Sequence, residues 1–196
     1  MGCLMRVNKV VFFFLVSFIF PKDTSFPEWI NSELNLLDPL CKAEFLFHDV
    51  QTNTKITTTL YIDNQNKKFR LEVEDRIIVS DTTTWKSVLK KNNQLFIQNV
   101  SKNERLYFKL LSRDYLIKSF IRQELNNGLT SFYFYLEEIS CSMIIHIDEL
   151  STIKNIDLEI NGNYYSIHNL VISNNFDPSL AFKMQEEDFI IFDLRE

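Results

Sequence analysis

The sequence predicts a mainly β protein with helices, in which a large antiparallel sheet of about eleven strands curls into an unclosed half-barrel covered by helices. From residue 43 onward apolar and polar side chains alternate, as where Phe69, Leu71 and Val73 stand between charged neighbours. Short Asn-rich links separate the alternating runs. The 18 phenylalanines against 3 glycines suit a large apolar surface, although a compositional bias of the source genome explains that count equally well.

Length and charge restrict the class of protein. The 196 residues fit one domain with a substantial core. The net charge is −5 and the pI is near 5.3, and no cluster of Lys and Arg forms a basic stripe. These values argue against a nucleic-acid-binding protein.

The N-terminus predicts export. Arg6 and Lys9 precede an apolar run over residues 10–20, which ends at Pro21 and is too short for a membrane-spanning helix. We therefore expect a signal peptide over residues 1–22 and a single domain over residues 23–196. The run lacks an Ala-x-Ala cleavage site and Met5 is an alternative start, so an uncleaved signal anchor is the other interpretation.

Two helical segments are expected to cover the sheet. The first begins near Ser25 and ends before Pro39, and the second lies near residues 104–119. Each has an apolar face by helical spacing. The residues expected to face the sheet are Trp29, Ile30, Leu34, Leu37, Tyr115 and Leu116.

The strands follow from alternation and from the links between them. Asn-Gly at Asn127 and Asn161 is a strong hairpin signal, because both residues tolerate a left-handed backbone. The predicted strands cover residues 45–50, 56–62, 68–73, 77–80, 85–89, 95–100, 120–125, 132–137, 143–148, 156–160 and 164–172.

One face of this sheet is predicted to be apolar and to line a cavity. A sheet of this size has more apolar face than a few short helices fill tightly, so a hollow for a hydrophobic ligand is expected. An ordinary close-packed core is the alternative. The predicted lining residues are Phe47, Leu60, Ile62, Phe69, Leu71, Val73, Trp85, Leu95, Ile97, Phe132, Phe134, Ile145 and Ile147.

The order of motifs along the chain resembles the LolA family of periplasmic lipoprotein carriers. A strand and turn lead to Ile-Val-Ser-Asp at residues 78–81, then to Trp85 and to an Asn-Gln strand at residue 93. The hairpin at residues 161–163, Phe-Lys-Met at residues 182–184 and a final Asp-Leu-Arg at residues 193–195 resemble the later part of that family.

The resemblance implies a function and partners. Members of this family have an unclosed barrel lidded by helices, whose apolar hollow receives the acyl chains of a lipoprotein. Cargo comes from an inner-membrane ABC transporter and passes to an outer-membrane acceptor. The resemblance therefore implies a monomeric periplasmic chaperone that needs no cofactor, metal or nucleotide.

The chain departs from the family pattern at two places. Thr82, Thr83 and Thr84 stand where the family has a glycine turn before its tryptophan. Gln65 replaces an arginine that hydrogen-bonds the lid in many members, and Arg70 belongs to the opposite face of its strand. Arginine-gated opening of the lid is therefore not expected here.

The remaining reactive residues do not indicate an enzyme. His48, His146 and His168 lack metal-ligand spacing, and the sequence has neither a Gly-x-Ser-x-Gly elbow nor a phosphate-binding glycine loop. For Cys41 and Cys141, a disulfide and two buried free thiols are both open. The alternatives to a lipoprotein carrier are an envelope structural or assembly protein and a carrier of small lipids.

Overall fold

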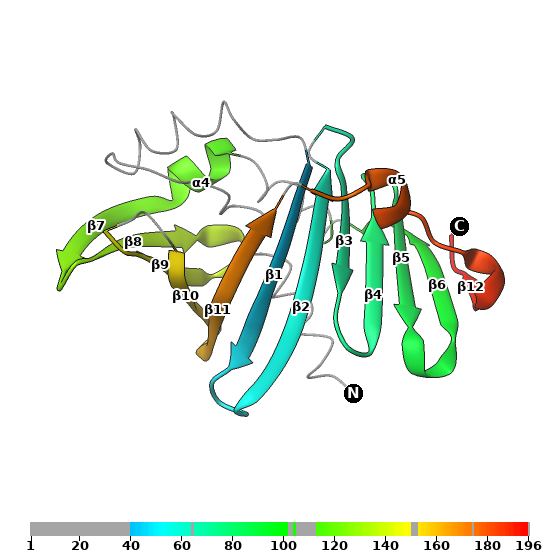
Figure 1. The fold of residues 1–196 in the computed structure, drawn as a ribbon, viewed down its shortest axis with the longest axis horizontal. Coiled ribbons are helices and arrows are strands. Elements are labelled where there is room, and N and C mark those ends of the chain that lie inside the picture. Colours follow the sequence, from blue (N-terminus) through cyan, green and yellow to red (C-terminus); the bar gives the residue numbers. More distant parts are fainter. Residues whose placement is uncertain are drawn as a thin grey trace.

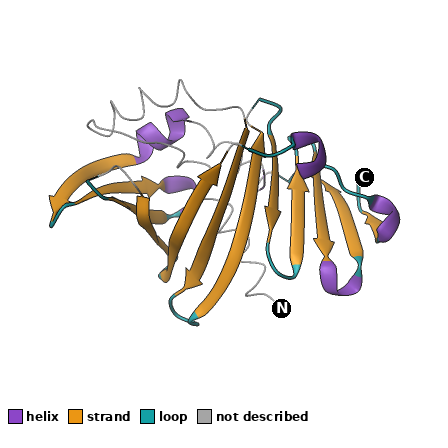
Figure 2. Ribbon diagram, viewed as in Figure 1, coloured by secondary structure: helices purple, strands orange, loops and turns teal. Residues whose placement is uncertain are grey.

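The computed structural model describes residues 40–63, 65–101, 104, 113–149, 153–173 and 175–195. These residues form one twelve-stranded sheet with short helices beside it (Figure 1, Figure 2). The strands are β1 Leu40–Asp49, β2 Thr54–Asp63, β3 Lys68–Glu72, β4 Arg76–Ser80, β5 Thr84–Leu89, β6 Gln94–Asn99, β7 Phe120–Asn126, β8 Leu129–Leu136, β9 Cys141–Ile147, β10 Ile153–Ile160, β11 Asn163–Ser173 and β12 Ile190–Asp193. The helices are α4 Arg113–Ser119 and α5 Pro178–Ala181, with 3-10 turns η2 Lys90–Asn92, η3 Glu137–Ile139 and η4 Glu186–Asp188.

Two antiparallel meanders make up the sheet. Strands β1 to β6 form one and β7 to β11 form the other, and they join at the centre where β1 pairs with β11. Strands β7 and β8 lie at a large angle to β1 to β6 (Figure 1), and the end strands β7 and β12 do not pair. The predicted fold class, an unclosed and curled β-sheet, is confirmed.

All eleven predicted strands are present, with bounds that differ by a few residues. The twelfth strand, β12, runs parallel to β6, so the sheet is not antiparallel throughout. After β11 the chain passes α5 and η4 before it reaches the free edge of β6. The chain runs in the same direction as β6 when it reaches this edge, so β12 pairs with β6 in parallel.

Asparagine supplies the left-handed backbone at several of the turns, as predicted, whereas Lys67 and Ser140 supply it between β2 and β3 and between β8 and β9. Asn93, Asn127 and Asn161 have φ values of 48°, 51° and 50°. Gly128 and Gly162 follow the last two with φ of 77° and 76°, so both Asn-Gly pairs have positive φ at both positions. This is the backbone of a tight two-residue hairpin turn, whose twist matches that of the flanking strands.

The sheet has two chemically different faces. We call the face that carries Phe69 and Leu71 the inner face, and the face that carries Arg70 and Glu72 the outer face. Cross-strand register extends this assignment to every neighbouring strand, because paired residues share a face. Most of the buried apolar side chains belong to the inner face.

Several predictions fall outside the described residues. The signal peptide over residues 1–22 does, and so do Trp29, Ile30, Leu34 and Leu37 of the expected first helix. Among the residues that are described, no helix has the length and apolar character needed to cross a membrane.

Candidate functional site

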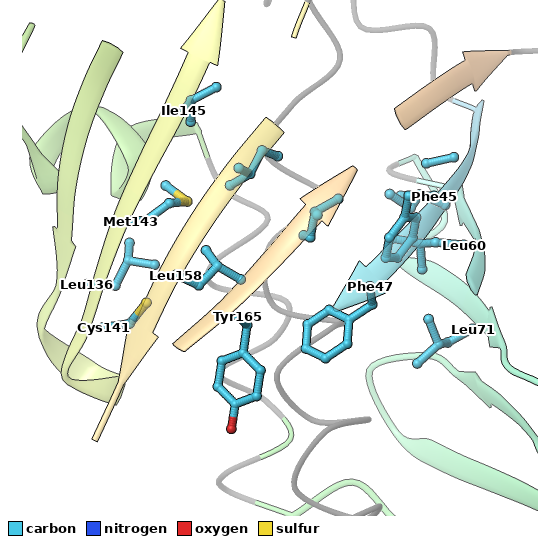
Figure 3. Packing of buried hydrophobic residues seen from close by; sticks show 14 of the residues in the cluster. Phe45, Phe47, Leu60, Leu71, Leu136, Cys141, Met143, Ile145, Leu158 and Tyr165 are labelled. Atoms are coloured by element: carbon cyan, nitrogen blue, oxygen red, sulfur yellow. The ribbon is translucent and has the colours of Figure 1, made fainter. Parts of the chain in front are cut away.

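The inner face is a continuous apolar surface that spans both meanders. Phe47 of β1 stacks on Tyr165 of β11, with ring centroids 5.4 Å apart, and this contact joins the two halves. Figure 3 shows Leu158 and Tyr165 projecting from one arm of the sheet and Phe47, Leu60 and Leu71 from the other. One cluster of buried side chains therefore runs from β5 to β8.

Most of the predicted lining residues belong to this cluster. Their exposed fractions are 8% or less, and Phe47, Leu60, Ile62, Phe69 and Ile145 are at 0%. The predicted residues found in the inner cluster are Phe47, Leu60, Ile62, Phe69, Leu71, Trp85, Phe132, Phe134, Ile145 and Ile147. Val73 is buried at the β3–β4 turn, outside this cluster.

The placement of Leu95 and Ile97 on the inner face was wrong. Leu95 pairs with Val88, and Val88 pairs with Ile77, which lies on the same face as Glu72. Leu95 and Ile97 therefore lie on the outer face, where they are 0% and 4% exposed. Both side chains are buried, but on the face opposite the other predicted lining residues.

The C-terminal segment covers this part of the outer face. Val88, Leu95 and Ile97 form a second buried cluster, against which Ile77, Met184 and Phe189 pack. Since Met184 and Phe189 come from the stretch between α5 and β12, the segment acts as a strap over β4, β5 and β6. We call residues 178–195 the C-terminal strap.

Polar contacts fix the strap to the sheet. Arg70 Nη1 donates to the carbonyl oxygens of Ala181 at 3.0 Å and Lys183 at 3.3 Å, and Arg70 Nε donates to Glu72 at 2.5 Å. Lys86 Nζ forms an ion pair with Glu186 at 2.5 Å. The alternation in β3 places Arg70 on the face opposite the apolar residues, but its side chain is only 16% exposed because the strap lies over it.

Helix α4 is the described helix that packs on the inner cluster. Tyr115 and Ile117 contact it, and the Tyr115 hydroxyl donates to Glu138. Tyr115 was predicted to face the sheet and does so, whereas Ile117 was missed. The side chain of Leu116 lies outside the described residues.

The sequence reasoning also missed part of the inner face. Phe45 and Met143 point inward at 3% and 1% exposure, in register with the predicted residues on either side. Strict period-two counting from Phe47 and Ile145 would have found both. Leu158 and Ile160 of the cluster were expected to point inward from the alternation over residues 156–160. The other buried members are Cys41, Ala43, Ile78, Val100, Leu136, Cys141, Ile156, Tyr165 and Ile167.

Comparison with solved structures shows the fold. The chain is similar over 88% of its length to the whole of an uncharacterized conserved protein from Thermus thermophilus, with a TM-score of 0.55 and 12% identity. Lipoprotein LppX from Mycobacterium tuberculosis has a TM-score of 0.40 at 8% identity, covering 78% of this chain and 98% of its own. LprF from Mycobacterium bovis has a TM-score of 0.39 at 8% identity, and the match covers 80% of this chain and 94% of LprF.

The comparisons do not establish a family. No protein-family model matches the chain, and no curated protein matches it in sequence. The Thermus thermophilus protein shares the fold, and the TM-scores of the two mycobacterial proteins are below 0.5.

Cys41 and Cys141 are buried free thiols, so the disulfide alternative is wrong. Through Ile160 of β10, Cys141 aligns with Asn163 at one end of β11. Lys42, the neighbour of Cys41, pairs with Ser173 at the other end of β11. The ten residues of β11 between Asn163 and Ser173 span roughly 30 Å, so the two cysteines lie near opposite ends of the strands. Burial raises the pKa of the Cys41 thiol to about 12 and also raises the pKa of Cys141.

The turn before Trp85 forms without a glycine. Asp81 Oδ1 accepts hydrogen bonds from the amides of Thr83 and Thr84, both at 2.7 Å, and from the Thr83 hydroxyl at 2.8 Å. Desolvation opposes the charged carboxylate, but these hydrogen bonds outweigh it and lower the pKa of Asp81. The aspartate thus organises the turn through its side chain.

A polar network on the outer face contains one of the three histidines. Ser131 Oγ and His146 Nδ1 are 2.9 Å apart, and His146 Nε2 and Asp157 Oδ2 are 3.1 Å apart. Ser131 is only 8% exposed, which leaves its hydroxyl little access to a substrate. Within the described part of the chain, no group of three or more His, Cys, Asp or Glu residues is arranged to hold a metal ion.

An open groove of about 390 Å³ lies beside this network on the outer face of β9 to β11. Ile144, Tyr164 and Val50 form apolar walls, and Asp157 and Glu159 line the groove as well. Most of its lining residues lie on the outer face, whereas the ligand-binding residues were predicted on the inner face; Leu158 and Tyr165 of the inner cluster also line the groove.

Proposed function

We propose that this chain is a non-enzymatic, extracytoplasmic carrier that shields the acyl chains of lipoproteins between the inner and outer membranes. The observation that carries the proposal is the continuous apolar inner face of a sheet whose end strands do not pair. Such a sheet can separate from its covering elements without breaking strand pairing. Acyl chains could then replace the protein's own apolar contacts.

Apolar burial alone can bind acyl chains, without an ion pair between the protein and its cargo. Burial of an acyl chain yields about 0.8 kcal/mol per methylene. Transfer from an inner-membrane ABC transporter to an outer-membrane acceptor then requires only that the acceptor bind the acyl chains more tightly than the carrier. The chain itself supplies apolar contacts and exclusion of water, and it acts as a monomer without cofactor.

One observation favours a second function, an envelope assembly protein that works through its surface. Phe47, Leu60 and Ile62 are each 0% exposed, as in a close-packed core. In a carrier these side chains must separate when cargo enters. In an assembly protein they stay in contact permanently.

Co-purification distinguishes these functions. The chain is exported in a diderm host, purified without detergent and analysed for bound lipid by mass spectrometry. Bound triacylated lipoproteins support the lipoprotein carrier, and free phospholipid alone indicates a small-lipid carrier. Absence of any lipid indicates the assembly protein.

Matched variants place the binding face. Leu71→Gln puts an amide on the inner face, and Val171→Gln makes the same kind of change on the outer face, where Val171 pairs with Glu44 and is 60% exposed. The first variant should reduce bound lipid and the second should not. Equal lipid content in both variants would contradict binding at the inner face.

A further inference from the structure

The two edges of the sheet differ in how well they are protected against pairing. Strand β7 carries Arg122 and Glu124, which form an ion pair at 3.2 Å, and Arg122 lies over the Tyr133 ring. Charged side chains of this kind keep an edge strand from pairing with another chain. The exposed apolar residues of β7, Ile121 and Leu125, lie on either side of this pair.

The β12 edge lacks this protection at its first three positions. Ile190, Ile191 and Phe192 are uncharged, with exposed fractions of 60%, 46% and 38%, and Leu194 just beyond the strand is 58% exposed. Apolar side chains thus occupy both faces of the edge strand. Exposed apolar edges of this kind are sites of strand addition.

The free backbone groups of β12 are identified by its pairing with β6. The Ile190 amide donates to Asn93 and the Leu194 amide donates to Ile97, each at 2.8 Å. In a parallel ladder alternate residues face the same neighbour, so the amide and carbonyl groups of Ile191 and Asp193 point away from β6. These two residues are the ones that an added strand would pair with.

From this pattern we infer that β12 pairs antiparallel with β12 of a second copy of this chain, about a two-fold axis at Phe192. This register places Ile191 opposite Asp193 of the second copy, so the outward backbone groups of both residues are used. On the inner face Phe192 meets its own symmetry mate, and Ile190 meets Leu194. The sequence Ile190-x-Phe192-x-Leu194 is symmetric in apolar character, which is what an isologous contact requires.

Charge also favours this register. Centring the pairing on Asp193 would place two carboxylates opposite each other, which is destabilising. Centring it on Phe192 instead brings Arg195 of one copy beside Phe189 of the other, next to the acidic residues of η4. Asp193 keeps its intramolecular ion pair with Arg195.

The contact is small, so the dimer is transient. Pairing of one short edge strand buries less than about 1,200 Å² in total, the range of weak and transient complexes. The monomer predicted from the sequence therefore stays the main species at low concentration. The dimer forms as concentration rises.

Sedimentation velocity on the exported chain tests the inference over a range of concentrations. The weight-average sedimentation coefficient should rise with concentration for the wild type. Ile191→Pro removes an amide that points away from β6 and leaves the hydrogen bonds between β12 and β6 in place. It should abolish the increase of the sedimentation coefficient with concentration. Leu125→Lys on the β7 edge should behave as the wild type. A wild type that stays monomeric up to its solubility limit overturns the inference, as does association that is lost in Leu125→Lys but kept in Ile191→Pro.

A second measurement does not depend on the folding of the proline variant. Phe192→Cys should form a covalent dimer under mild oxidation, because the register brings the two residue-192 side chains together across the axis. Leu125→Cys, at the other edge, is the matched control, and the wild type oxidised in parallel gives the background from its buried thiols. Cross-linking of Leu125→Cys but not of Phe192→Cys contradicts the proposed pairing.

Discussion

Arg70 and Ala181 are 111 positions apart in the sequence, yet Arg70 Nη1 donates a 3.0 Å hydrogen bond to the Ala181 carbonyl. This bond ties the C-terminal strap to the middle of the β1–β6 meander. The strap in turn buries Leu95 and Ile97 and carries β12 to the edge of the sheet. The bond and the apolar contacts of the strap therefore lie on the same face of the sheet.

Arg70→Ala should loosen the strap. A hydrogen bond to a charged group contributes about 1.5–3 kcal/mol, so we expect a loss of that order in the free energy of unfolding and faster tryptic cleavage at Lys183. Urea denaturation and limited proteolysis measure the two effects. Arg122→Ala removes an exposed ion pair at β7 and should change stability by less than about 1 kcal/mol. Equal effects of the two variants would show that Arg70 does not anchor the strap.

Phe69→Ala should destabilise the inner cluster. Phe69 is 0% exposed and its ring contacts Trp85, with centroids 5.5 Å apart. Truncation of a buried phenylalanine costs about 3–5 kcal/mol, measured as a lower urea midpoint. Tyr135→Ala on β8, where the side chain is 43% exposed, is the aromatic control and should cost much less.

Ile97→Ala separates stability from ligand binding. Ile97 belongs to the outer cluster, so its truncation should cost about 2–5 kcal/mol but leave the lipid content of the purified protein unchanged. Leu71→Ala should change both, because Leu71 lies on the inner face. Loss of lipid from Ile97→Ala at a temperature where the variant is folded would contradict the face assignment.

The thiols of Cys41 and Cys141 should be unreactive in the native protein. Their raised pKa keeps them protonated at neutral pH, and only the thiolate reacts with alkylating agents. Peptide mapping after iodoacetamide treatment should find both unmodified in buffer and both modified in urea. A peptide that links Cys41 to Cys141 in the unreduced protein would contradict the strand register.

Stability should fall in acid through Asp81. Because the pKa of this carboxyl is lower in the folded state than in the unfolded chain, its contribution is fully present above the unfolded value of about 3.9. The contribution is lost as the pH decreases through the folded pKa. Urea midpoints at pH 7 and about pH 3 should therefore differ less in Asp81→Asn than in the wild type. An unchanged difference would show that Asp81 does not stabilise the turn.

The alternation of charged and apolar residues in β3 was enough to predict its faces. Lys68, Arg70 and Glu72 leave only one way to place Phe69 and Leu71 inward. Strand β6 offers no such constraint, since Leu95, Phe96 and Ile97 are three consecutive apolar residues. Prediction failed there because a shift of one residue exchanges the two faces, and nothing local indicated which face was covered.

Local patterns in the sequence were enough to predict the eleven strands, many of their asparagine turns and most of the inner face, because period-two alternation and left-handed turn residues act locally. Tertiary packing, in contrast, produces the second cluster, the parallel strand β12 and the separation of Cys41 from Cys141. These features depend on where residues far apart in the chain meet. The strap docks on β4 to β6 because Met184 and Phe189 bury apolar surface there, which alternation within a single strand cannot reveal.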